Sequence, residues 1–158
     1  MTVRYLKAAV CSRPGRVRLS AVVLAAALAA ACSTSSVPAP RAIALDKDVC
    51  VKCGEVIHTL NAAAQVVHVD GTTRVYDDIG CLATDQAALS GGGQFYVQFA
   101  GGKGWMRVED VHFALQTDRV SPRGFNYFAY TEEEARRVDI DHWARGWGDI
   151  VAVLNRQK

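Results

Sequence analysis

Three cysteines of this chain have the residue type and the spacing for thiol or soft-metal chemistry. Cys50 and Cys53 form a Cys-x-x-Cys pair, and Gly54 lets the backbone bend tightly behind them. Such a pair forms a disulfide, exchanges disulfides, or binds a soft metal ion. A zinc ribbon needs a second pair, which is missing, and a thioredoxin-like motif needs a strand-to-helix junction, whereas residues 55–58 are predicted to be extended. All three interpretations stay open on these residues alone.

The third cysteine, Cys81, is predicted to lie in the first turn of a helix. Backbone N–H groups there favour a thiolate, although Asp77 and Asp78 oppose it electrostatically. Cys81 is equally consistent with a small buried apolar residue.

Among the four histidines, His68 is the candidate metal ligand that we would test first, because it directly precedes a predicted turn. Met106, the only methionine besides Met1, is predicted to pack in the core.

The elements that must position these residues follow from local patterns. Asp70-Gly71 predicts a two-residue hairpin turn with both φ angles positive. Asp77 or Asp78 is suited to cap a helix, and Thr131 with Glu134 forms a capping box. The predicted elements are strands over 64–69 and 73–76, a helix from 79 to about 89, strands over 94–100, 105–108, 111–115 and 126–130, a helix from 132 to about 143, and a strand over 150–154.

This order of elements predicts an α+β domain. Each half reads as two strands, an acid-capped helix, a glycine-rich stop and an apolar strand, so we expect two related strand-strand-helix-strand halves. A single sheet without a repeat is the alternative, and it would leave the cysteine arguments unchanged.

The first 31 residues have the pattern of a lipoprotein export signal. They contain five basic residues and no acidic one, and end in an apolar run over 21–31 that is too short to span a bilayer. Cys32 follows small residues as in a lipobox, so we predict a signal peptide over 1–31, lipidation at Cys32, a linker over 32–45 and one folded domain over 46–158. Ser33 favours outer-membrane sorting in a host with two membranes. A soluble periplasmic protein is the alternative.

Removal of the signal changes the net charge. The whole chain has 18 basic and 16 acidic residues, and the mature chain keeps 13 basic against 16 acidic, a net charge of −3. No basic stripe with interleaved aromatic residues is present, so no nucleic-acid partner is expected. The mature 127 residues are enough for one domain without disulfides, and three cysteines besides Cys32 make a poor disulfide framework.

The order of the motifs over residues 49–154 resembles the NosL family, the lipoprotein copper chaperones associated with maturation of nitrous-oxide reductase. The matching motifs are Cys50-x-x-Cys53-Gly54, Ala63-Ala64-Gln65 before a hairpin, Tyr76-Asp77-Asp78-Ile79-Gly80-Cys81-Leu82, Trp105 before a strand, and Ser121-Pro122-Arg123-Gly124-Phe125 before Phe128-Ala129-Tyr130. The resemblance implies a two-part α+β fold similar to that of the organomercurial lyase. It also implies Cu(I) binding through cysteine with methionine assistance, and delivery of copper to a partner protein.

This chain departs from the family at both methionine positions, where it has Glu55 and Arg123. A carboxylate suits Cu(I) poorly, and a guanidinium has no lone pair for a metal. We therefore expect thiolates to be the remaining soft ligands. We also expect a Glu55–Arg123 ion pair beside the thiol pair.

Together, these inferences predict a lipid-anchored periplasmic protein that binds Cu(I) at Cys50 and Cys53, with Cys81 and His68 as further candidate ligands. It would pass copper to a copper enzyme, such as nitrous-oxide reductase, or to a copper-transport protein, and would not itself be an enzyme. One alternative is thiol-redox or lyase-like chemistry of the cysteines, for which no further general acid is evident. The other is a protein-binding lipoprotein that has lost the metal.

Overall fold

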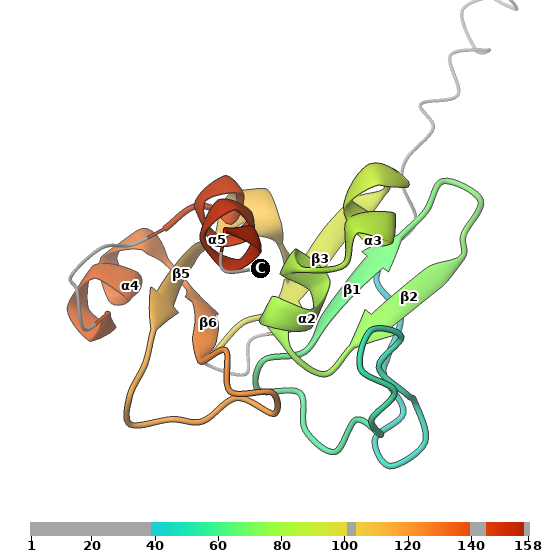
Figure 1. Ribbon diagram of the computed structural model, residues 1–158, viewed down its shortest axis with the longest axis horizontal. Helices are drawn as coiled ribbons and strands as arrows, with labels where there is room; N and C mark the ends of the chain where they lie inside the picture. The colour runs from blue at the N-terminus through green and yellow to red at the C-terminus, as the bar shows by residue number, and fades with distance from the viewer. Residues whose placement is uncertain (1–38, 101–103, 140–144, 157–158) are drawn as a thin grey trace, which may run out of the picture. The chain divides into compact units, whose positions relative to one another are not determined.

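The fold combines two antiparallel sheets with short helices and belongs to the α+β class, as predicted (Figure 1). It is seen in a computed structural model that describes residues 39–100, 104–139 and 145–156. The first sheet has the order β2-β1-β3-β4, and the second pairs β5 with β6. The strands are β1 (Ala64–Val67), β2 (Thr73–Tyr76), β3 (Gln94–Gln98), β4 (Trp105–Arg107), β5 (His112–Leu115) and β6 (Tyr127–Tyr130).

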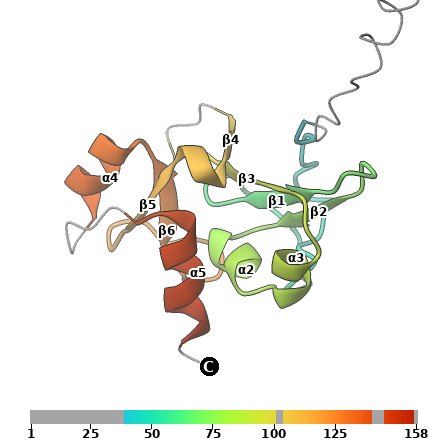
Figure 2. The same ribbon diagram turned by 90° about the horizontal axis from the view of Figure 1, so that it is seen from above.

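The helices pack on the sheets through one shared core. They are α2 (Ile79–Ala83), α3 (Gln86–Ser90), the 3-10 helix η2 (Val108–Asp110), α4 (Glu132–Val138) and α5 (Trp147–Asn155). Figure 2 shows α2 and α3 on one face of the first sheet, and α2 also contacts α5 and β6. The buried cluster contains Tyr76, Ile79 and Leu82 from the first half together with Phe113 and Ile150 from the second. Burying one such aliphatic or phenylalanine side chain stabilises the fold by about 1.5–3 kcal/mol.

The β1–β2 hairpin forms as predicted, but its turn differs. The His68 N–H bonds to the Thr72 carbonyl (2.9 Å), which leaves three residues in the loop. Only Gly71 has a positive φ, of 84°, whereas Asp70 does not enter the left-handed region. The Asp70 carboxylate instead accepts from the Thr72 N–H (2.9 Å). The predicted two-residue turn is therefore wrong, because this side-chain bond favours the longer loop.

The predicted helix over residues 79–89 is two short helices. The Thr84 hydroxyl donates to the Gly80 carbonyl (2.8 Å) at the end of α2. Asp85 then begins α3, because its carboxylate accepts from the Ala87 N–H (3.2 Å). The same carboxylate accepts from the buried Tyr76 hydroxyl (3.0 Å). This bond to the preceding strand holds Asp85 outside a continuous helix, and helical periodicity does not reveal it.

The second half confirms the capping box and contradicts the final strand. The Thr131 hydroxyl accepts from the Glu134 N–H (3.3 Å), and the Glu134 carboxylate accepts from the Thr131 N–H (3.2 Å). Helix α4 ends at Val138, while residues 140–143 of the longer predicted helix lie outside the described chain.

Residues 150–154, predicted to be a strand, belong to helix α5. Its apolar residues Trp147, Ile150, Val151 and Leu154 recur at helical spacing and pack on the core. The Asp149 carboxylate accepts from the Gly146 N–H (3.2 Å) and caps the helix start. The short apolar run alone does not distinguish a strand from a buried helix.

The two halves are less alike than predicted. The first half contains the predicted strand-strand-helix-strand order, although its helix is divided, whereas the described second half has two strands followed by two helices. Strand β4 pairs with β3 and so extends the first sheet. The sheets meet where Phe99 forms a parallel bridge with Ala129, and the Ala100 N–H donates to the Ala129 carbonyl (2.9 Å).

The segment before the thiol pair is packed against the domain. Ile43 is a buried core residue, and Arg41 forms an ion pair with Asp48 (2.7 Å), so the ordered contacts begin before the predicted boundary at residue 46. The predicted signal peptide and Cys32 lie outside the described chain. Within residues 39–100, 104–139 and 145–156, no helix has the length and apolar character needed to cross a bilayer.

The start of α2 ties the two halves together. The buried carboxylate of Asp78 accepts from the Gly80 N–H (2.8 Å), the Ser121 hydroxyl (2.6 Å) and the Arg123 N–H (3.0 Å). Burial raises the pKa of Asp78, while the three donors act in the opposite direction because they stabilise the carboxylate. Beside it, Phe125 packs so closely on Gly80 that an added Cβ would overlap the aromatic side chain.

Replacing Gly80 with alanine is expected to lower the free energy of unfolding by about 1–3 kcal/mol, because the new methyl group must displace Phe125. Gly148 is the matched control, since a Cβ there meets nothing within 4 Å and the site lies in helix α5. Gly148→Ala should leave stability unchanged or raise it slightly. Chemical denaturation of both variants measures this, and equal stability of Gly80→Ala and the parent chain would contradict the packing argument.

Candidate metal centre

Cys50 and Cys53 lie on a tight loop formed by residues 46–57, called here the thiol loop. Its two sides are joined by a bridge between Val49 and Val56, and the Cys50 N–H donates to the Glu55 carbonyl (2.8 Å). The Gly54 N–H donates to the Cys50 carbonyl (2.9 Å), and Gly54 has a φ of 79°. Glycine suits this position because other residues rarely adopt the left-handed conformation.

The thiol loop is held against the strand that leads to the other ligands. The Val51 N–H donates to the Val75 carbonyl of β2 (3.0 Å). Asp77 directly follows β2, and Cys81 is the third residue of α2. Because Asp78 serves as the N-cap of α2, Asp77 is the carboxylate left to face the thiol loop.

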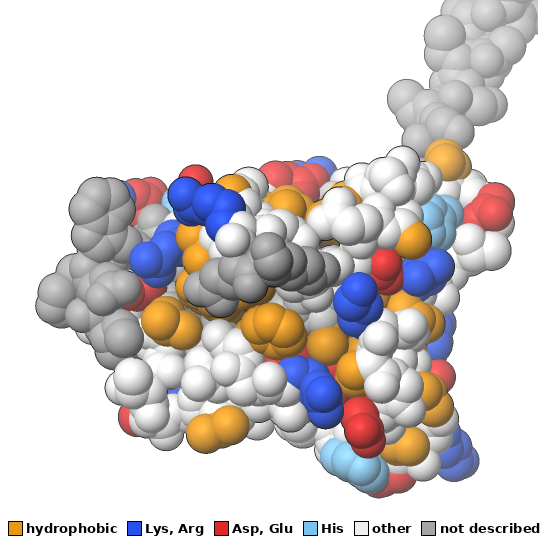
Figure 3. All heavy atoms as spheres, in the orientation of Figure 1, with side chains coloured by type: hydrophobic (Ala, Val, Ile, Leu, Met, Phe, Trp, Pro, Cys, Tyr) orange, Lys and Arg blue, Asp and Glu red, His pale blue; other side chains and the backbone are white. Residues whose placement is uncertain are grey.

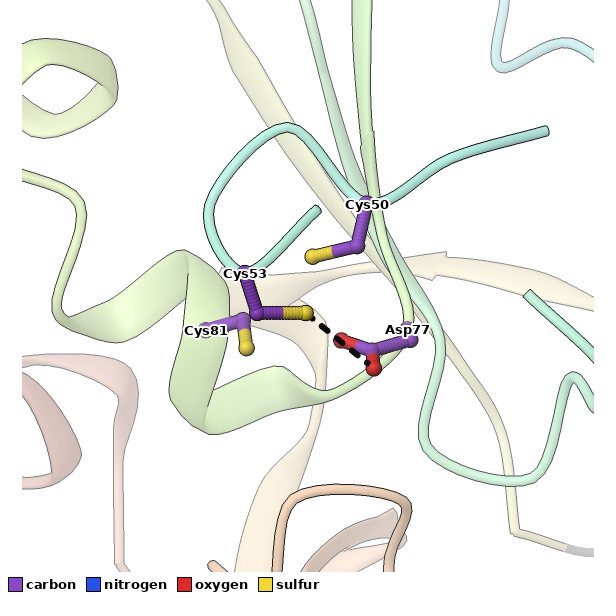
Figure 4. A group of neighbouring side chains, drawn as sticks. All are labelled: Cys50, Cys53, Asp77 and Cys81. Carbon is purple, nitrogen blue, oxygen red and sulfur yellow. Dashed lines mark hydrogen bonds between the residues drawn. The ribbon is translucent and has the colours of Figure 1, made fainter. Parts of the chain in front are cut away.

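Four side chains converge at this point (Figure 4). The sulfurs of Cys50, Cys53 and Cys81 and a carboxylate oxygen of Asp77 all lie within 4.8 Å of one another. The Cys53 thiol donates to Asp77 Oδ2 (3.5 Å), and the three cysteines are free thiols. Asp77 Oδ1 is buried and has no hydrogen-bond partner. We refer to these four residues as the thiol–carboxylate cluster.

Solvent reaches the cluster from one side. Cys50 is 0% exposed, and Cys81 and Asp77 are each 3% exposed. Cys53 is only half-buried, and its loop neighbour Lys52 is exposed. An ion or a partner's ligand would therefore meet Cys53 first.

The three thiols differ in acidity because of their neighbours. A hydrogen bond from the Cys81 thiol lowers the pKa of Cys50 to about 6, with help from the backbone N–H groups of Asp77 and Cys53 and against the effect of burial. Burial raises the pKa of Cys53 to about 11, and the neighbouring Cys50 adds to this rise. The pKa of Cys81 is also raised, first by its bond to Cys50 and then by burial. Cys50 is thus the most acidic of the three thiols.

The structure brings together three of the four predicted metal residues. His68 lies apart from the cluster, beside Gly91 and Gly93 in the turn before β3. Met106 packs on the core as predicted.

The predicted Glu55–Arg123 ion pair is not formed, and both side chains are exposed. The Arg123 backbone is held instead by Asp78, as described above.

Asp77 is the cluster member that sequence reasoning missed. Its position next to Asp78 suggested only a capping role and an unfavourable charge near Cys81. The sequence did not predict that the Asp77 carboxylate accepts a hydrogen bond from the Cys53 thiol. The signal that would have found it is that one helix start needs one cap, so two adjacent carboxylates leave one for another role.

Comparisons with protein-family models, with curated proteins and with solved structures found no match for this chain. The resemblance to the NosL family rests on the sequence motifs.

Proposed function

We propose that this protein is a Cu(I)-binding metallochaperone, anchored to a membrane by lipid at Cys32 and facing the periplasm. The observation that supports it most is the convergence of three thiols at one site, since thiolates are the ligands that Cu(I) prefers. The signal-like segment over residues 1–31 and the order of motifs support the location and the class of protein.

The acidities of the thiols suit capture of a soft cation. Cys50, with its pKa near 6, is already a thiolate at neutral pH and provides the first ligand. Cys53 and Cys81 lose their protons as the ion binds, because the metal competes for the same lone pairs. Asp77 is a hard oxygen ligand, so we assign Cu(I) to the sulfurs alone.

Release to a partner follows from the exposure of Cys53. A donor atom of the receiving protein reaches the ion beside Cys53, while the two buried sulfurs still hold it. Copper then passes by ligand exchange without entering free solution. The receiving protein in this proposal is a copper enzyme such as nitrous-oxide reductase, or a copper-transport protein.

The same geometry disfavours disulfide exchange as the main activity. An exchanging thiol must be both ionised and accessible. Here the thiol with the lowered pKa, Cys50, is completely buried, and the accessible thiol, Cys53, has a raised pKa. The two requirements fall on different residues.

A Cu(I) titration of the reduced full-length chain in detergent tests the proposal. In competition with a chromophoric Cu(I) chelator, we expect one Cu(I) per chain, and X-ray absorption should show sulfur as the only ligand type. No competition with the chelator, or an oxygen- and nitrogen-rich metal environment, would refute the proposed function.

A further inference from the structure

Cu(I) binding by the sulfurs gives no role to the Asp77 carboxylate. Asp77 is 3% exposed, and its Oδ1 atom is buried without a hydrogen-bond partner, while Oδ2 accepts one bond from Cys53. A buried carboxylate oxygen without a partner is costly and rare. One oxygen of the same carboxylate lies within 4.8 Å of all three cysteine sulfurs, and this arrangement indicates a ligand that would occupy the space between the four groups.

The dimensions of the cluster suit one four-coordinate ion. At a zinc–sulfur distance of about 2.3 Å, the sulfurs of a tetrahedral site are roughly 3.8 Å apart. The four ligand atoms here are all within 4.8 Å of one another, so movements of less than about 1 Å would close the site. The half-buried Cys53 is on a loop tip that can make this adjustment.

The donor set suits a divalent ion with borderline softness. Zn²⁺ accepts cysteine sulfur and aspartate oxygen in the same tetrahedral shell, whereas Cu(I) has little affinity for a carboxylate. Three thiolates and one carboxylate would leave the bound Zn²⁺ complex with excess negative charge. Backbone N–H groups offset it, because those of Cys53 and Asp77 point to the Cys50 sulfur and that of Glu55 points to the Cys53 sulfur.

We propose that Cys50, Cys53, Cys81 and Asp77 form a tetrahedral site for Zn²⁺, with Asp77 as the fourth ligand. This inference uses the thiols of the proposed function but does not depend on copper binding. Zinc would connect the thiol loop to α2 and to the residue that directly follows β2, since these are the places from which the four ligands come. Asp77 thus distinguishes the two metals, because only the divalent ion would use it.

The test is a pair of matched carboxylate-to-amide variants of the reduced full-length chain. Zn²⁺ affinity is measured against a chromophoric chelator, and Co²⁺ replaces Zn²⁺ for absorption spectra. Asp77→Asn should weaken Zn²⁺ binding by at least about tenfold and reduce the tetrahedral Co²⁺ bands, with Cu(I) affinity nearly unchanged. Glu55→Gln removes an exposed carboxylate of the thiol loop and should change the affinity for neither metal.

A second variant keeps the test decisive if Asp77→Asn does not fold. Asp77→Cys should retain tetrahedral Co²⁺ and gain thiolate-to-metal charge-transfer intensity, because a fourth sulfur replaces the oxygen. Unchanged charge transfer in folded Asp77→Cys, or equal Zn²⁺ affinity of Asp77→Asn and Glu55→Gln, would overturn the zinc site. Cu(I) binding without Zn²⁺ binding overturns this inference alone, and Zn²⁺ binding without Cu(I) binding overturns the proposed copper function alone.

Discussion

Replacing either cysteine of the thiol loop with serine is expected to lower the affinity for Cu(I) by at least about 100-fold, because a hydroxyl is a poor ligand for this soft ion. Cys53→Ser is the more informative change, since Cys53 is half-buried and serine is easily accommodated there. Cys50→Ser removes the thiolate that is present at neutral pH and places a hydroxyl in the core, so its stability must be measured as well. Cys81→Ser should have a smaller effect if two thiolates are sufficient.

Two control variants separate loss of a ligand from a general loss of sulfur or imidazole. Met106→Leu removes the only thioether of the described chain, which packs on the core outside the cluster. His68→Ala removes the histidine predicted as a ligand, which lies beside the turn before β3. Both variants should bind Cu(I) like the parent chain in the chelator competition. Unchanged binding in all three cysteine variants would show that the copper site is elsewhere.

The affinity for Cu(I) is also expected to increase with pH, by about tenfold per pH unit for each proton that binding displaces. Cys50 has a pKa of about 6 and is already ionised above pH 7, so it contributes no proton there. Cys53 has a pKa of about 11 and must lose its proton to bind. If Cys50 and Cys53 form the site, the Cu(I) affinity should therefore increase about tenfold per pH unit between roughly pH 7 and 9. If all three thiols bind, the increase should be about a hundredfold per pH unit.

The Cu(I) affinity increases with pH because protons and the metal compete for the same sulfur atoms. As pH falls through the pKa of Cys50, another proton joins the competition and affinity should fall more steeply. Chelator competition across this pH range measures how steeply the Cu(I) affinity depends on pH. Cys53→Ser removes one displaced proton, so it should lower this dependence by about tenfold per pH unit. An affinity that does not change between pH 7 and 9 would contradict the assignment of Cys53 as a protonated ligand.

Where local hydrogen bonds determine structure, the sequence predicted which elements form, although the predicted length of the hairpin turn was wrong. The capping box of Thr131 and Glu134 and the hairpin around Gly71 are formed within a few residues of chain. These features need only neighbouring side chains and backbone, so their residue types are sufficient to predict them.

Predictions failed where distant residues decide the outcome. Residues 150–154 are apolar enough for a strand, but they form a helix because this places Ile150 and Leu154 on the core beside Trp147. The single predicted helix over 79–89 is broken because Asp85 bonds to Tyr76 of β2. The Glu55–Arg123 pair was inferred from family positions, and neither side chain is buried where such a pair would be held.

The sequence by itself determined the α+β class, the strands β1, β2 and β3, and the candidate chemistry of Cys50, Cys53 and Cys81. Only the tertiary structure decided that the three thiols converge, that His68 lies apart, and that Asp77 completes the cluster. The reason is that cysteine spacing fixes one turn of the chain, whereas convergence depends on the Val51–Val75 bond and on the register of β2 with the thiol loop. The choice between Asp77 and Asp78 depends on a contact more than 40 residues away, where Ser121 and Arg123 bind Asp78 and leave Asp77 to the sulfurs.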